Sequence, residues 1–80
     1  MYYTIPRLAR YEFEHIADAR KRAVSHLTLS DNHDVVHIYE VRRGLQGMVF
    51  PMMMNGKRRF IYRSSEGIDY TINKDGTLKR

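Results

Sequence analysis

The chain has 80 residues, of which 42% are hydrophobic and 29% charged, and it carries a net charge of +5 with no cysteine. This length leaves room for one domain, and the absence of cysteine excludes disulfide bonds, thiolate catalysis and cysteine-ligated zinc. A domain of this size buries only about 60% of the surface that its unfolded chain exposes, so a partner often adds stability. The sequence therefore predicts a single small domain over residues 1–80.

Targeting and membrane signals are weak along the chain. The first ten residues, MYYTIPRLAR, contain no continuous apolar segment typical of a signal peptide. The longest apolar run, 48–54, includes a proline and is far shorter than the ~20 residues that cross a bilayer. We therefore expect a cytoplasmic protein that does not associate with membranes.

The first half of the chain predicts a strand followed by a helix. Residues 2–5 are typical of a short strand, which Pro6 ends or confines to a sheet edge. Residues 12–28 predict an amphipathic helix, whose first turn is uncertain because no good N-cap residue precedes it. The polar run 30–34 predicts the loop that ends the helix. The helical stripe, with one charged exception, comprises Phe13, Ile16, Ala17, Arg20, Ala23, Val24 and Leu27.

Beyond residue 34 the apolar spacing changes to the period of two that is typical of strands. Strands are predicted at 35–43, 48–54, 57–64 and 68–72. After a turn at 73–77, Leu78 returns beside Ile72. The predicted fold is α+β: one amphipathic helix packed on an antiparallel meander of four or five strands, in two layers. The expected core is Phe13, Ile16, Ala17, Val24, Leu27, Phe60, Tyr62, Tyr70 and Ile72.

Two features of this arrangement stay open. Asn55-Gly56 predicts a tight type I′ hairpin turn; a two-residue turn places Phe50 opposite Ile61, whereas a three-residue loop with a bulge places it opposite Phe60. The strand at 35–43 has an apolar side with Val36 and Ile38 and another with Val35, Tyr39 and Val41, and either could face the helix.

Both hairpin registers leave apolar side chains on each face, while one helix covers only one face of the sheet. The other face could be covered by the C-terminal hairpin, by a second copy, by another protein, or by the stems of Arg59 and Arg63. We therefore expect a non-enzymatic protein-interaction module that forms a homodimer or docks another protein through its sheet. The predicted partner-binding residues are Met48, Phe50, Met52, Arg59, Ile61 and Arg63.

The alternative function is binding of nucleic acid or another polyanion. The charge excess is confined to the middle of the chain, and basic surfaces of this kind contact polyanions. The predicted residues for this function are Arg42, Arg43, Lys57, Arg58, Arg59 and Arg63.

Catalytic and metal-binding patterns are absent from the sequence. A helix would place His15 and His26 about 16 Å apart, too far for one ion, and His33 and His37 fall across a loop-to-strand junction. No nucleophile elbow and no phosphate-binding loop with its lysine occurs. We therefore predict no enzyme activity, no catalytic residues, no metal, no cofactor and no small-molecule substrate.

Overall fold

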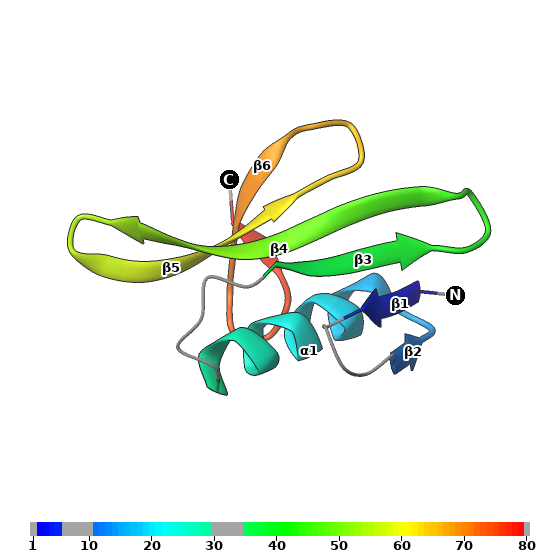
Figure 1. Cartoon of the computed structure of the whole chain (residues 1–80), viewed down its shortest axis with the longest axis horizontal. Coiled ribbons are helices and arrows are strands. Elements are labelled where there is room, and N and C mark those ends of the chain that lie inside the picture. The colour runs from blue at the N-terminus through cyan, green and yellow to red at the C-terminus, as the bar shows by residue number, and fades with distance from the viewer. Residues whose placement is uncertain (1, 6–10, 30–34, 80) are drawn as a thin grey trace.

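The computed structural model describes residues 2–5, 11–29 and 35–79 and shows one helix packed on an antiparallel sheet (Figure 1). The helix is α1 (Ile16–Leu29). The strands are β1 (Tyr2–Ile5), β2 (Tyr11–Phe13), β3 (Val36–Glu40), β4 (Leu45–Met54), β5 (Lys57–Arg63), β6 (Asp69–Ile72) and β7 (Leu78–Lys79). The predicted two-layer α+β fold is therefore confirmed.

In the described part of the chain the sheet has seven strands in the order β2-β1-β3-β4-β5-β6-β7, and every neighbouring pair is antiparallel. Strands β3 to β7 follow one another as the predicted meander. Strand β1 pairs with β3 and β2 pairs with β1, so the N-terminal strands extend the sheet beyond the four or five strands expected.

The helix begins later than predicted. Residues 11–13, which include the first predicted helical residues, form β2, and α1 starts at Ile16. Phe13 still packs against the core, but from a strand and not from a helix. Its apolar spacing with Ile16 therefore did not identify the secondary structure correctly. Pro6 and the predicted loop at 30–34 lie outside the described residues.

The hairpin between β4 and β5 has the two-residue turn. Asn55 and Gly56 adopt positive φ angles of 52° and 75°, as a type I′ turn requires. Met54 pairs with Lys57 and Phe50 with Ile61. Beyond the residues that pair with β3 and β6, this hairpin continues as a two-stranded arm, hereafter the ribbon (residues 50–60), which extends away from the body of the fold (Figure 1).

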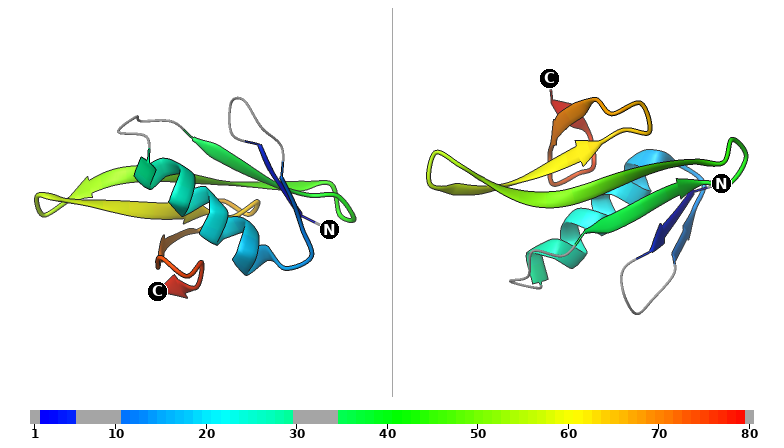
Figure 2. Two further views of the ribbon diagram at one scale, coloured as in Figure 1. Left: turned by 90° about the horizontal axis from the view of Figure 1, so that it is seen from below. Right: turned by 45° about the horizontal axis from the view of Figure 1, so that its top comes forward.

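The helix covers the sheet face that carries Val36 and Ile38, and it lies against this face over most of its length (Figure 2). The buried cluster between the layers is Ala19, Ala23, Val24, Leu27, Val36, Ile38, Val49, Tyr62 and Ile72. Of the predicted core residues, Phe13, Ile16, Phe60 and Tyr70 pack against this cluster while partly exposed. Ala17 is only partly buried and lies outside it, beside the turn that contains Gly76.

Arg20 explains the charged exception in the helical stripe. Its Nε donates a 2.7 Å hydrogen bond to the Gly76 carbonyl oxygen, and its guanidinium carbon lies 5.3 Å from the centre of the Tyr62 ring. A single cation therefore joins the helix to the β6–β7 turn and to β5, which lets Arg20 occupy an inward-facing position.

Candidate functional site

The sheet face that α1 leaves uncovered, hereafter the open face, carries a row of apolar side chains along β4. Side chains alternate along a strand, and Val49 lies in the core. The open-face residues of β4 are therefore Gln46, Met48, Phe50, Met52 and Met54. The adjoining positions of β3 are His37 and Tyr39, and Val35 directly precedes the strand; Val35 and Tyr39 are exposed.

Part of the open face is covered by the chain itself. Ile61 is only 6% exposed, although it belongs to the face opposite the helix. Its strand neighbours there are Phe50 and Thr71. The β5–β6 turn rises on this side of the sheet (Figure 1), so the sheet curls over its own open face. Of the predicted partner-binding residues, Ile61 therefore has almost no surface available for contact.

Arg63 also covers an apolar neighbour. Its guanidinium carbon lies 5.2 Å from the centre of the Phe50 ring, and its Nε donates a 2.7 Å hydrogen bond to the Asp69 carboxylate. This hydrogen bond lowers the pKa of Asp69. Arg63 therefore shields Phe50, as proposed for its stem, and its charge is balanced by Asp69.

The methionines of the ribbon remain exposed. Met52 and Met54 on the open face are 41% and 40% exposed, and Met53 on the opposite face is 63% exposed. Arg59 lies across from Met52 and is also exposed. The exposed members of the predicted partner-binding set are therefore Met52, Arg59 and Arg63, of which Arg63 is paired with Asp69, while Met48 and Phe50 are half-buried.

A basic groove lies where the ribbon extends past β6. This groove, hereafter the basic groove, runs between the ribbon and the β6–β7 hairpin and has a volume of about 510 Å³. Among the described residues that line it, five are cations and none is acidic. The full lining is Met54, Asn55, Lys57, Arg58, Arg59, Phe60, Thr71, Ile72, Asn73, Lys74 and Lys79.

One cation of the basic groove is held rigidly. Arg58 Nη1 donates a 2.8 Å hydrogen bond to the Leu27 carbonyl oxygen near the end of α1. Its guanidinium carbon lies 5.1 Å from the centre of the Phe60 ring. The two contacts hold a planar cation over an aromatic ring among the residues that line the groove.

The residues predicted for polyanion binding do not form one surface. Arg42 and Arg43 lie in the turn between β3 and β4. This turn is at the opposite end of β4 from the β4–β5 turn, which Lys57, Arg58 and Arg59 follow (Figure 1). Arg63 is paired with Asp69. The basic groove adds two cations that sequence reasoning missed, Lys74 and Lys79, because charge was counted along the chain and not across the paired strands.

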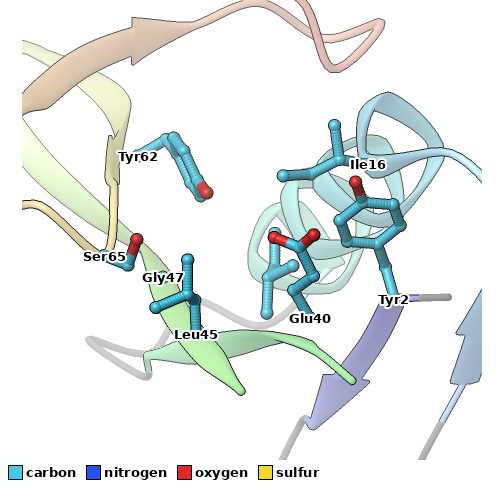
Figure 3. Close-up of a pocket in the computed structure, with 8 residues that line it drawn as sticks. Tyr2, Ile16, Glu40, Leu45, Gly47, Tyr62 and Ser65 are labelled. Atoms are coloured by element: carbon cyan, nitrogen blue, oxygen red, sulfur yellow. The ribbon is translucent and has the colours of Figure 1, made fainter. Parts of the chain in front are cut away.

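A small cavity of about 30 Å³ lies between the start of α1 and the sheet (Figure 3). Its lining includes the Glu40 carboxylate and the Tyr62 hydroxyl group, which both point into it, with Tyr2 beside them. Burial raises the pKa of Tyr62; the Arg20 guanidinium partly offsets this effect, and the Glu40 carboxylate adds to it. The volume admits about one water molecule, and the lining contains no histidine.

The histidines are spread over the described part of the fold. His15 precedes α1, His26 lies in its last turns and His37 lies on β3, where its Nδ1 is 2.6 Å from Gln46 Nε2. Among the described residues, no three histidine or carboxylate side chains gather as a metal site. His33 lies outside these residues.

Within the described ranges, the protein has no helix of the length and apolarity needed to span a membrane. Comparison with protein-family models, with curated proteins and with solved structures finds no match to this chain.

Proposed function

We propose that the chain is a non-enzymatic protein-interaction module that self-associates through the open face of its sheet. One observation carries this proposal: β4 places Met48, Phe50, Met52 and Met54 in a row on the face that α1 does not cover. A sheet face that meets water is normally polar. A row of apolar side chains on such a face gains stability from a further layer, and a second sheet supplies one at a spacing of about 10 Å.

The distribution of charge favours one orientation of a second copy. The β5 side of the open face carries Lys57 and Arg59, whereas the β3 side carries His37 and Tyr39, with Val35 directly before the strand. A twofold axis along β4 lays the β5 side of each copy over the β3 side of the other. This arrangement separates the cations and brings the two apolar rows together in one isologous contact.

Measurement of the oligomeric state tests the proposal, with adjacent methionines as a matched pair. Met52 lies on the open face and Met53 on the opposite face of the same strand. In sedimentation at concentrations up to tens of micromolar, the wild-type chain is expected to dimerise, Met52→Thr to dimerise more weakly and Met53→Thr to match the wild type. Threonine suits an exposed strand position, and circular dichroism checks that both variants fold.

Two results would contradict the proposal. One is a wild-type chain that sediments as a monomer at every concentration. The other is an equal loss of dimer in the two methionine variants, which would show that the contact does not distinguish the faces of β4.

A further inference from the structure

The basic groove holds positive charge that the described residues do not balance. No carboxylate of the described chain pairs with Lys57, Arg59, Lys74 or Lys79. These residues line one groove although they come from β5, from the β6–β7 turn and from β7, with Lys57 and Arg59 on the open-face side of β5. Cations that converge on a concave surface raise the local potential and attract polyanions. This local concentration of charge points to a polyanionic ligand.

Part of the lining of the basic groove is not charged. Met54, Phe60 and Ile72 supply apolar surface, and Asn55 and Asn73 supply amide groups. The Arg58 guanidinium lies over the Phe60 ring and is fixed by the Leu27 carbonyl oxygen. A rigid planar pair of this kind offers a surface on which a nucleobase can stack. A ligand that carries both phosphates and accessible bases would use the cations and this pair together.

We propose that the basic groove binds single-stranded nucleic acid, with Lys57, Arg59, Lys74 and Lys79 contacting phosphates and the Arg58–Phe60 pair stacking against a base. Proteins that bind single strands combine a positively charged groove with stacking platforms in this way. A duplex presents its phosphates on a convex surface and keeps its bases stacked inside, so it fits the groove less well. An acidic peptide would use the cations but gains nothing from the stacking pair.

This proposal can be tested separately from dimerisation, because Met52 does not line the basic groove and Met52→Thr leaves its lining unchanged. The same variant should therefore bind a single strand as the wild-type chain does. Loss of the dimer and loss of nucleic-acid binding are then separate results.

Fluorescence anisotropy with a labelled oligothymidylate tests the proposal. Lys74→Gln with Lys79→Gln removes two groove cations from exposed positions, whereas the control pair Arg42→Gln with Arg43→Gln removes the same charge from the distant β3–β4 turn. The groove pair is expected to bind several-fold more weakly at low salt. The plot of log affinity against log salt should also become less steep, its slope falling in magnitude by about 1.4, since each single-strand phosphate contact contributes about 0.7. The control pair should bind nearly as the wild type does.

Matched ligands separate the possible occupants. An abasic oligomer of the same length keeps the phosphates and removes the bases, and we expect it to bind more weakly because stacking is lost. A duplex and polyglutamate should also bind more weakly than oligothymidylate. The proposal would be overturned if the chain did not bind oligothymidylate at low salt, or if the two variant pairs lost affinity equally. It would also be overturned if the duplex, the abasic oligomer or polyglutamate bound as tightly as oligothymidylate or more tightly.

Discussion

The ring of Tyr62 lies over Gly47: a Cβ atom at Gly47 would stand 2.7 Å from the Tyr62 hydroxyl oxygen and 2.9 Å from its Cε1. Gly47 belongs to β4 and Tyr62 to the neighbouring strand β5. The missing side chain at Gly47 therefore provides the space that the aromatic ring occupies, an arrangement that also fixes register in designed sheets.

Substitution of Gly47 by alanine should therefore destabilise the fold. The methyl group must displace the buried Tyr62 ring or the strand, and forced overpacking of this kind costs about 1–3 kcal/mol. Urea denaturation measures the loss. In a Tyr62→Leu background the same substitution should cost less, because the two closest clashing atoms, both of Tyr62, are absent. An equal cost in both backgrounds would show that Tyr62 does not set the requirement for glycine.

Gly76 should tolerate alanine even less, because two constraints coincide there. Its φ is +89°, and a Cβ atom would stand 2.9 Å from the Lys21 amide nitrogen and closer still to the Ala17 carbonyl oxygen. Gly67 is a matched control, since its φ is +84° with no atom within 4 Å of a Cβ. Thermal unfolding should show a larger loss for Gly76→Ala than for Gly67→Ala. Equal losses would mean that the backbone conformation alone requires the glycine.

Arg20→Met should destabilise the protein although it adds an apolar side chain to the helix. It removes the hydrogen bond to the Gly76 carbonyl oxygen and the contact with the Tyr62 ring. Loss of a hydrogen bond from a charged group costs about 1.5–3 kcal/mol. Lys21→Met, at an exposed position of the same helix, is the control in urea denaturation. A larger effect at Lys21 would contradict the role assigned to Arg20.

Stability should decline at alkaline pH through Tyr62. Burial raises its pKa, so the folded state holds this proton more tightly than the unfolded state does. The contribution is fully present below the usual tyrosine pKa of about 10 and is lost as the pH rises through the raised folded value. Tyr62→Phe should lose less stability than the wild type between neutral pH and strongly alkaline pH, as urea denaturation can measure. Parallel losses would rule out Tyr62 as the group responsible.

Acid should act through Asp75 with the opposite sign. The Thr77 hydroxyl and backbone N–H donate to its carboxylate at 2.6 and 3.0 Å and lower its pKa. This stabilisation is present above the usual aspartate pKa of about 3.9 and is lost as the pH falls through the lowered value. Asp75→Asn should therefore lose less stability on acidification than the wild type. Glu66→Gln, at an exposed turn position, is the control, and an equal change in both variants would contradict the assignment.

Turn chemistry was the most informative part of the sequence. Asn55-Gly56 predicted a type I′ turn, and its two-residue form sets the whole β4–β5 register. The turn at 73–77 likewise returned Leu78 beside Ile72, with Gly76 in the left-handed region. Both predictions are confirmed because the conformations of these turns depend on residues that lie within them.

The N-terminal region could not be predicted as well, because apolar spacing does not identify the backbone that produces it. Phe13 fits the helical stripe, yet it reaches the core from β2. Ala17 also fits, but Ala19 and Ala23 are the alanines that are fully buried in the helix. The small alanine side chain contributes little to a spacing argument, and only the docked helix shows which alanines face the sheet.

The cations of the basic groove were not grouped correctly from the sequence, for a different reason. A count of charge along the chain grouped Arg42 and Arg43 with Lys57, although the fold separates them. It assigned Lys74 and Lys79 to a neutral remainder, although the pairing of β5, β6 and β7 brings them to the same groove as Lys57.

The two-residue turn at Asn55-Gly56 also restricts how the chain can change in length. One inserted residue at the tip would shift the parity of β5 against β4, so that Ile61 would face α1 while Phe60 and Tyr62 faced outward. Two inserted residues would preserve that parity and merely lengthen the arm. Viable homologues or designed variants should therefore differ at this tip by even numbers of residues.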